Sequence, residues 1–536
     1  MTTSSPPEPG PSGLAPGPDP SSGARLSEIV AALSFASDFG LGQPMEHVLR
    51  ACLIALRLAE RLGLDDVRRR EAYWVTLLAT VCTGESFELA RTFGDDIAFR
   101  SGMYHVGPSQ FAQLLYVMKR AGSGSGSAAA RARATSGIVA SGGKSVEDIF
   151  LAHCAVTSGL AARLGLEPGV ADALTHTFAR WDGKGVPRGD SAEVPVSVQV
   201  MQMADFAEVH HRLRGVEGAV ELARRDAGHV FAPEVSRTFA DDAPELLAGL
   251  DEDVWGRVVD AEPLPRPPLD EAGVDSVLEV MADIVDLKSP WFGGHSRGVA
   301  ELAAWAAAAA GMPDRDVVAV RRAGLVHDIG RTAVPNSIWD KREALAEGER
   351  ERVRLHAYYT ERMLRRPVAL AGLSAIAASH HERLDGSGYH RGIRGSDIPL
   401  LGRYLAAADV YHAVLEARPH RPAMTPKDAA GHLRAEVRAG RLDAAAVDVV
   451  LGVSGHRTTG PPAAPAGLTP REVEVLVLVA RGASTRYVAR TLGITPKTAG
   501  NHIERIYAKI GATSRSSATL FAMQHGMLAT LEPVQA

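Results

Sequence analysis

The sequence predicts an all-α protein made of successive helical domains, and two observations point to this class. Ala, Leu, Arg and Glu are abundant in the 536 residues while aromatic residues make up only 5%, a composition that favours helices. Proline-rich stretches at 261–269 (AEPLPRPPL) and 457–467 (RTTGPPAAPAG) are typical of linkers. We therefore expect three folded segments over 24–260, 270–456 and 467–530.

The remaining compositional features describe the surroundings of these domains. Residues 1–23 are rich in Pro, Gly and Ser, which predicts a disordered tail. A softer break at 121–137 (AGSGSGSAAARARATSG) predicts a loop or a small-residue insertion. The chain shows neither a signal-peptide pattern nor an apolar run long enough for a bilayer, and its three cysteines lack metal-like spacing. We expect a cytoplasmic protein with no membrane partner.

Seven residues of the middle segment are predicted to form a metal centre. They are imidazoles and carboxylates without a thiolate, a set that suits divalent first-row ions. Several lie in or at the ends of Ala-rich segments with helical character, and helical bundles build metal sites from inward-pointing side chains. Any one of these histidines alone is more often structural, so the prediction depends on the whole set. The candidate ligands are His295, His327, Asp328, His356, His380, His381 and Asp409.

The adjacent His327-Asp328 pair is the most informative part of this set. Such a carboxylate can bridge two metal ions while the imidazole binds one of them, and paired metals activate water for phosphoester hydrolysis. Three motifs occur in order: HDIG at 327–330, HHERLDGSGY at 380–389 and ADVYHAVLEARPHRPA at 408–423. Together they make residues 275–430 resemble an HD-GYP domain, a branch of the HD phosphohydrolases.

This resemblance implies an all-helical domain that hydrolyses cyclic di-GMP with a two- or three-metal centre containing iron or manganese. It implies metal-ligand roles for the seven residues, with Asp328 as the bridging catalytic carboxylate. It also implies that Arg418 and Arg421 bind the phosphates of the ligand, since an Arg fork suits paired phosphate oxygens.

Four positions depart from the family pattern. Arg331 stands where the family has lysine, so we expect it beside the departing oxygen with altered phosphate positioning. The Gly-Tyr-Pro signature is Gly-Tyr-His at 388–390, which removes a rigid turn residue. His412 replaces a usual aspartate. Trp291 occupies the position of a glutamate that some members carry, which favours two metal ions over three.

The sequence of the first segment predicts a degenerate copy of the second. WDGKGVPRG at 181–189 aligns with LDGSGYHRG at 384–392, and in each segment a histidine precedes the aspartate of this motif by the same number of residues. The alignment places His47, His153 and Asp205 opposite three of the metal ligands. The other four ligands are replaced by Cys82-Thr83 and Thr177-Phe178.

Loss of these four ligands should abolish a dinuclear centre in the first segment. We expect a catalytically inactive HD-GYP-like domain for sensing or dimerisation, in which the three retained residues are structural. The alternative is an unrelated helical domain with a chance WDGKG match.

The C-terminal segment shows a helix-turn-helix pattern. Thr469 to Glu472 form a capping box, Thr485–Leu492 predicts a short second helix, and Gly493 provides the turn. Thr495-Pro496 then caps a recognition helix over Pro496–Lys509. With its TPRE start and IYAKIGATSR ending, the segment resembles the four-helix LuxR-type DNA-binding domain.

DNA is the predicted partner of this segment, because residues 467–536 carry eight Lys and Arg against four Glu. The resemblance implies contacts with DNA by Lys497, Thr498, Asn501, His502, Arg505 and Lys509, and binding as a homodimer on paired half-sites. Gly500 and Glu504 stand where the family has basic residues, so we expect weaker or differently specific binding. A packing role for these helices is the alternative.

Two main functions follow from these patterns. The first is a bacterial transcriptional regulator whose HD-GYP domain, with two divalent metal ions (iron or manganese), hydrolyses a cyclic dinucleotide, with cyclic di-GMP as the expected substrate. The second is a non-catalytic transcription factor whose HD-GYP domain only binds the nucleotide. An HD phosphohydrolase acting on another nucleotide is a third possibility.

Overall fold

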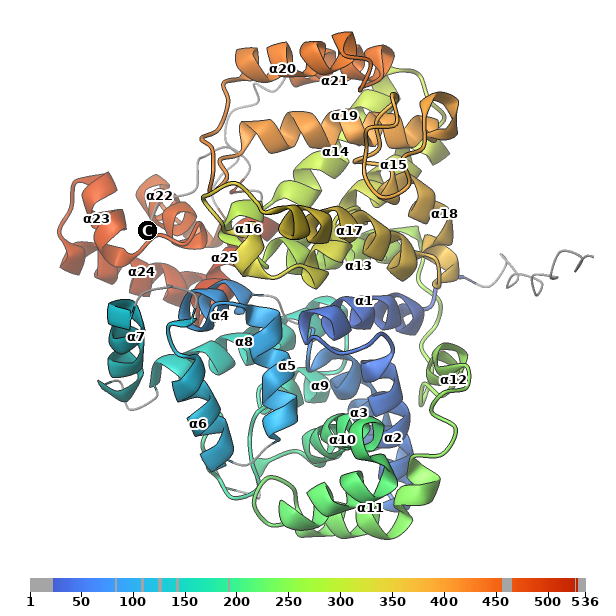
Figure 1. The fold of residues 1–536 in the computed structure, drawn as a ribbon, viewed down its shortest axis with the longest axis vertical. Helices are drawn as coiled ribbons and strands as arrows, with labels where there is room; N and C mark the ends of the chain where they lie inside the picture. The colour runs from blue at the N-terminus through green and yellow to red at the C-terminus, as the bar shows by residue number, and fades with distance from the viewer. Residues whose placement is uncertain are drawn as a thin grey trace, which may run out of the picture.

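The computed structural model describes residues 23–81, 84–107, 110–123, 128–140, 144–190, 193–455, 465–525 and 527–528. Within these residues all regular elements are helices, as predicted, and the chain forms two helical bodies with a smaller helical domain beside them (Figure 1). Most of the N-terminal tail and of the second linker lie outside the described residues.

The first body contains twelve α-helices within the described residues. They are α1 (Leu26–Gly40), α2 (His47–Arg61), α3 (Asp66–Leu78), α4 (Ser86–Phe93), α5 (Asp96–Val106), α6 (Gln110–Arg120), α7 (Ala128–Ala140), α8 (Lys144–Arg163), α9 (Pro168–Leu174), α10 (Val196–Arg225), α11 (Pro233–Leu246) and α12 (Val254–Asp260). The prediction of a loop over 121–137 is wrong from residue 128 onward, because α7 covers this Ala- and Arg-rich stretch, whose residues have high helix propensity.

The second body contains α-helices joined by short 3-10 turns. The elements are α13 (Glu271–Asp286), η3 (Pro290–Phe292), α14 (His295–Ala309), α15 (Asp314–Val326), η4 (Ile329–Ala333), α16 (Asn336–Trp339), α17 (Glu347–Leu364), α18 (Val368–Ala378), η5 (Gly395–Asp397), α19 (Leu400–Leu415), α20 (Pro426–Arg438) and α21 (Ala444–Ser454).

The two bodies share the same arrangement at the start of one helix. Helices α2 and α14 each begin at a histidine that follows a left-handed residue, Glu46 and Gly294 respectively. The carboxylate nine residues before that histidine accepts the second N–H of the helix: Asp38 from Val48 at 3.0 Å and Asp286 from Ser296 at 2.9 Å. Burial raises the pKa of Asp38 to about 7 and that of Asp286 to about 6. This shared construction supports the interpretation of the first body as a copy of the second.

The apolar core does not stop at the boundary between the two bodies. One continuous cluster of buried side chains extends from α1 to α21, and α1 packs against η4 and α17 of the second body. Asp96 of α5 and Lys288 form an ion pair at 3.2 Å, and both side chains are fully buried. The first linker contacts the start of the first body, since Leu269 donates its N–H to the carbonyl of Ala24.

The third domain has the predicted elements α22 (Pro470–Ala480), α23 (Thr485–Leu492), α24 (Pro496–Ile510) and α25 (Arg515–Gln524). The Thr469 capping box is present, and Gly493 ends α23 in the left-handed conformation. Its core includes Val156 of α8 and Leu287 of the second body. The domain is therefore packed against both larger bodies, beside α4 and α8 (Figure 1).

Candidate metal centre

Two glycines allow the backbone to place the His327-Asp328 pair. His327 caps α15, and Asp328 leads into η4. A Cβ at Gly324 would lie 2.6 Å from the Cα of Ala300, so glycine is needed for α15 to approach α14 this closely. A Cβ at Gly330 would collide with the carbonyl oxygen of His356, so glycine also lets η4 lie against α17. The HDIG glycine is thus a packing requirement of the site.

The histidines are oriented by hydrogen bonds from their outer ring nitrogens. Nδ1 of His327 lies 2.7 Å from the carbonyl of Gly324, and Nδ1 of His380 lies 2.6 Å from that of Ala377. His356 makes the same contact with the carbonyl three residues before it. Since a carbonyl oxygen only accepts, Nδ1 carries the proton in each ring and Nε2 presents its lone pair inward.

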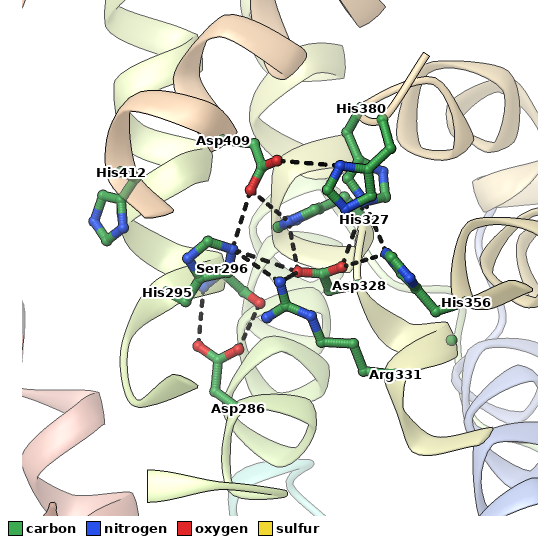
Figure 2. Close-up of polar contacts among 12 residues, drawn as sticks. Asp286, His295, Ser296, His327, Asp328, Arg331, His356, His380, Asp409 and His412 are labelled. Atoms are coloured by element: carbon green, nitrogen blue, oxygen red, sulfur yellow. Dashed lines mark hydrogen bonds and ion pairs between the residues drawn. The ribbon is translucent and has the colours of Figure 1, made fainter. Parts of the chain in front are cut away.

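These inward nitrogens divide between the two carboxylate oxygens of Asp328, as Figure 2 shows. Nε2 of His327 and of His295 lie 2.8 and 3.4 Å from Oδ2. Nε2 of His356 and of His380 lie 3.2 and 3.4 Å from Oδ1. Asp409 lies on the first side, with Oδ1 3.3 Å from Nε2 of His295. The carboxylate therefore faces two separate sets of nitrogens.

The donor atoms fall into two groups that could each hold a metal ion. One group is His295, His327 and Asp409, and the other is Asp328, His356, His380 and His381. His381 is the most accessible of the predicted ligands, with its side chain 18% exposed and Nδ1 3.7 Å from Oδ2 of Asp409. The structure thus brings together all seven residues predicted from the sequence.

The electrostatics of the centre suit cations. The carboxylate of Asp328 is fully buried, and the imidazoles of His327 and His356 surround it at 2.8 and 3.2 Å. Burial lowers the pKa of His380 to about 4 and holds that of His381 well below its usual value, so both rings are neutral and able to ligate. Burial opposes ionisation of Asp409, but the surrounding histidines hold its pKa below the usual value. Buried carboxylates beside the neutral imidazoles of His380 and His381 fit divalent ions.

Arg331 lies beside the bridging carboxylate. Its Nη2 is 2.5 Å from Oδ2 of Asp328, and its guanidinium carbon lies 4.4 Å from the ring centroid of Phe292. Nε and Nη1 of Arg331 are buried without a hydrogen-bond partner among the described residues. Two nitrogens with three N–H donors therefore remain beside the centre for an anionic group.

The two predicted phosphate-binding arginines are held in different ways. Arg418 donates to the carbonyl of Trp291 at 2.7 Å and to Glu416 at 2.6 Å. Arg421 donates to the backbone carbonyls of Glu416 and Ala413 at the end of α19. In this structure Arg421 stabilises the loop after α19, and phosphate binding by either residue stays a prediction.

A further group of possible ligands beside the centre was not predicted from the sequence. Glu416 lies 3.1 Å from Nδ1 of His295 and 2.9 Å from Nδ1 of His412. Asp409, His412 and Glu416 are spaced i, i+3 and i+7, which places them on one face of the α19 segment. This spacing is the signal that could have revealed Glu416.

The altered signature loop is tightly packed. A Cβ at Gly388 would lie 2.5 Å from the Cα of Glu382, so this position requires glycine. The ring of Tyr389 lies 4.3 Å from that of His381, and His390 is 3.6 Å from Glu361. The loop therefore contacts the exposed side of the metal centre through Tyr389.

The corresponding residues of the first body make ion pairs in place of a ligand set. His47 lies 3.0 Å from Asp205 and 2.6 Å from Glu208. Burial opposes protonation of His47, but the two carboxylates raise its pKa to about 10. His153 contacts the carbonyl of Ala79 at 2.6 Å. Among the described residues no potential metal-binding group occurs in this body, whereas Cys82 and Thr83 lie outside them.

The predicted DNA-contacting residues lie on α24. Lys497, Thr498, Asn501, Arg505 and Lys509 are exposed and His502 is half-buried. Lys509 forms an ion pair with Glu472 at 2.7 Å, which ties α24 to the start of α22. The other exposed residues form a surface that a phosphate backbone and base edges could reach.

Comparisons with known proteins match both parts of the chain. Residues 279–446 match the family model described as HD domain, and residues 466–522 match that of bacterial regulatory proteins of the luxR family. The 3'3'-cGAMP-specific phosphodiesterase 3 of Vibrio cholerae is 31% identical over 406 residues, which cover 74% of this chain and 88% of that protein.

Two further comparisons extend this similarity. The cyclic di-GMP phosphodiesterase response regulator RpfG of Xanthomonas campestris is 38% identical over 146 residues, which cover 26% of this chain and 38% of that protein. The crystal structure of a cyclic GMP-AMP specific phosphodiesterase of V. cholerae (V-cGAP3) aligns with a TM-score of 0.56 and 26% identity, over 81% of this chain and 98% of that chain. Among the residues that the structure describes, no helix is both long and apolar enough to cross a membrane.

Proposed function

Because this chain belongs to the HD-GYP family of metal-dependent phosphohydrolases, we propose that it is a cyclic-dinucleotide phosphodiesterase that regulates transcription through its LuxR-type domain. The observation that supports catalysis best is the division of inward nitrogens between the two oxygens of Asp328. A carboxylate with this surrounding is suited to bridge two divalent ions, with iron or manganese as the expected metals.

Metal ions bound at this centre would polarise a phosphoryl oxygen and lower the pKa of a water molecule. His295, His327 and Asp409 would hold one ion, and His356, His380 and His381 would hold the other, with Asp328 shared. Arg331 would donate from its unpartnered Nε and Nη1 to phosphate oxygens as charge develops there. Tyr389, whose ring packs against that of His381, would border the entrance to the metal centre.

The substrate class comes from the relatives. The V. cholerae protein that aligns over 74% of this chain is named for 3'3'-cGAMP, and RpfG is named for cyclic di-GMP. Both nucleotides present two phosphodiesters in one ring. We propose a cyclic dinucleotide as the substrate and expect a direct comparison of these two molecules to identify it.

The hydrolysis test uses the full chain loaded with Mn²⁺ or Fe²⁺ and incubated with each nucleotide. Chromatography should show linear dinucleotide or mononucleotide products. Asp328→Ala should lower the rate by at least about 100-fold, because the shared ligand of both ions is lost. Asp448→Ala, an exposed aspartate on α21, is the matched control. Hydrolysis that persists unchanged in Asp328→Ala would place catalysis elsewhere.

A second candidate is a sensor that binds the nucleotide without cleaving it. The engagement of Arg418 by Glu416 and Trp291, together with the altered loop at 388–390, favours this alternative. Calorimetric binding of either nucleotide without any product after prolonged incubation with metal would support the sensor and exclude the hydrolase.

DNA binding is proposed for the face of α24. Exposed Lys497, Asn501 and Arg505 can reach the phosphate backbone and base edges, and a homodimer would present two such helices to paired half-sites. Gel-shift titrations of the full chain with a random-sequence DNA pool should show affinity that falls with salt, at a log–log slope of about −3 to −5.

Variants separate base reading from phosphate binding. Asn501→Ala should change the preferred sequence, since asparagine reads adenine, whereas Lys497→Ala should weaken binding to all sequences alike. Lys427→Ala, an exposed lysine of α20, is the matched control. Salt-insensitive binding, or none to any fragment, would leave a protein-interaction role for this domain.

A further inference from the structure

A cavity of about 390 Å³ lies in the first body where the second body has its metal centre. Its wall includes His153, Thr177, Phe178 and Asp205, which the sequence aligns with His356, His380, His381 and Asp409. The volume falls in the range of about 300–1,000 Å³ that small-molecule sites occupy. A partly open space of this size thus lies at the position that corresponds to the metal centre.

The wall is largely apolar. Side chains from several helices contribute to it, among them Leu33 and Ala36 of α1, Leu89 of α4, Phe99 of α5 and Val146 of α8. Burying apolar ligand surface against such a wall is favourable, at roughly 25 cal/mol per Å². The body of an occupant should therefore be apolar.

Two buried oxygens on the wall lack partners. The amide nitrogen of Gln202 donates to the carbonyls of Thr177 and Ala179 at 2.9 and 2.7 Å, which fixes its Oε1 as the free end. Gln202 is 7% exposed, and neither its Oε1 nor Oγ1 of Thr80 has a hydrogen-bond partner among the described residues. The position corresponding to Gln202 in the second body is Ala406. An unpaired buried acceptor costs free energy, and an occupant with an N–H or O–H donor would satisfy it.

The buried charges of the wall are already neutralised. Arg100 pairs with Glu85 at 2.7 Å, Arg180 pairs with Asp182 at 2.9 Å, and Asp205 pairs with His47. Lys184 is exposed to solvent. An occupant with a net charge would gain little here, so the wall favours a neutral molecule.

We propose that this cavity binds a neutral, mostly apolar small molecule that carries one hydrogen-bond donor, and that its occupancy is transmitted to the HDIG segment. Thr332 lies on the same wall and directly follows Arg331, and Ile284 of α13 contributes beside it. Helix α1, which supplies Leu33 and Ala36, packs against η4. A bound molecule would therefore contact the segment that positions Asp328 and Arg331.

Binding is measured on the full chain with N-phenyl-1-naphthylamine, a neutral apolar fluorophore with one N–H. Its fluorescence should rise saturably, with one molecule bound at this site per chain. Ala36→Leu and Val146→Phe add volume to the wall, and each should weaken binding at least about tenfold. Val67→Phe, at an exposed position on α3, is the matched control and should bind as the wild type does. Thermal unfolding identifies any variant that fails to fold. Wild-type affinity in both folded wall variants would overturn the site.

Displacement of the fluorophore tests the chemistry of the occupant. 4-Hexylphenol should compete about five- to tenfold better than 4-hexylanisole, which lacks the O–H, and Gln202→Met should reduce this preference. Tighter competition by 4-hexylbenzoate would overturn the assignment of a neutral ligand.

Hydrogen exchange tests the transmission to the second body. Saturating fluorophore should slow exchange in peptides from α1 and from 327–336, while peptides from α20 serve as the internal control. An unchanged exchange rate in 327–336 at saturation would overturn the coupling. Neither readout depends on hydrolysis, so these results are independent of the proposed catalytic activity.

Discussion

At the scale of single residues, His47 and His295 show how one position acquires two roles. Both begin a helix after a left-handed residue, and both face a carboxylate on the helix that corresponds to α19. His295 has further potential ligands around it, whereas the described residues that form ion pairs around His47 are Asp205 and Glu208, with Arg50 nearby. Burial opposes protonation of both imidazoles, but neighbouring carboxylates raise the pKa of each above its usual value. The two positions differ because only His295, among the described residues, belongs to a potential metal-binding group.

His47→Leu should destabilise the full chain by ~3 kcal/mol near pH 6.5, because it leaves Asp205 and Glu208 without their buried cation. The pKa of His47 is raised to about 10 in the folded chain, from an ordinary value of 6.5. A raised folded-state pKa gives stability that is complete below the unfolded value and is lost as the pH rises through the folded value. The difference in stability between wild type and variant should therefore narrow between pH 6.5 and 10.

Thermal unfolding of both proteins across this pH range measures the effect. His229→Leu, which replaces an exposed histidine elsewhere in the first body, serves as the control. A difference that stays constant with pH would mean that His47 is neutral in the folded chain.

At the scale of elements, the metal centre depends on how closely η4 approaches α17. Gly330 makes that approach possible, and Thr360 of α17 fixes it by donating to the carbonyl of His327 at 2.9 Å while accepting the N–H of Gly330 at 3.1 Å. Helix α17 also carries His356, which belongs to the group of ligands at Oδ1 of Asp328. The distance between η4 and α17 thus affects the metal position that uses His356 more than the position that uses His295 and His327.

Gly330→Ala should displace α17 from η4 and weaken the metal position that uses His356, while the position of His295 and His327 is retained. We expect the bound metal to fall from about two ions per chain to about one, and hydrolysis to fall about 10- to 100-fold. Elemental analysis after dialysis measures the stoichiometry. Gly348→Ala, a glycine of α17 with open space around it, is the control. Full occupancy of both positions in Gly330→Ala would contradict this account.

At the scale of the whole molecule, the three domains share buried contacts. Lys288 of the second body pairs with Asp96 of the first, and Asn336 donates its backbone N–H to the same carboxylate at 2.8 Å. The third domain adds an ion pair between Arg515 and Glu88 at 3.3 Å, and its core includes Val156. A change in one body can therefore reach the others through packed side chains.

Asp96→Asn should destabilise the full chain by ~3–5 kcal/mol, because it leaves the buried Lys288 cation without its anion. Lys288→Met combined with Asp96→Asn should recover at least half of this loss. Burial opposes ionisation of Asp96, but Lys288 and Arg100 hold its pKa below 3.8, so its stabilising contribution is present above that pH and is lost as the pH falls through the folded-state value. Urea unfolding of the three proteins at pH 7 measures the effect, and equal stability of the two variants would contradict it.

The sequence by itself predicted the helical class, the helix-turn-helix domain and the seven candidate ligands, because each depends on local spacing. Residues such as His327 and Asp328 are adjacent, and caps such as Thr469 act within a few residues. The sequence also predicts a degenerate first body, because Thr177 and Phe178 cannot replace imidazole ligands, and this interpretation stays a prediction.

Only the tertiary structure decided which distant atoms meet. It placed Glu416 against His295, paired Arg421 with backbone carbonyls and buried the Asp96–Lys288 pair between the two bodies. It also revealed the cavity at the position of the lost ligands. Local sequence patterns report spacing along one element, whereas these features depend on how close the packed elements come to one another.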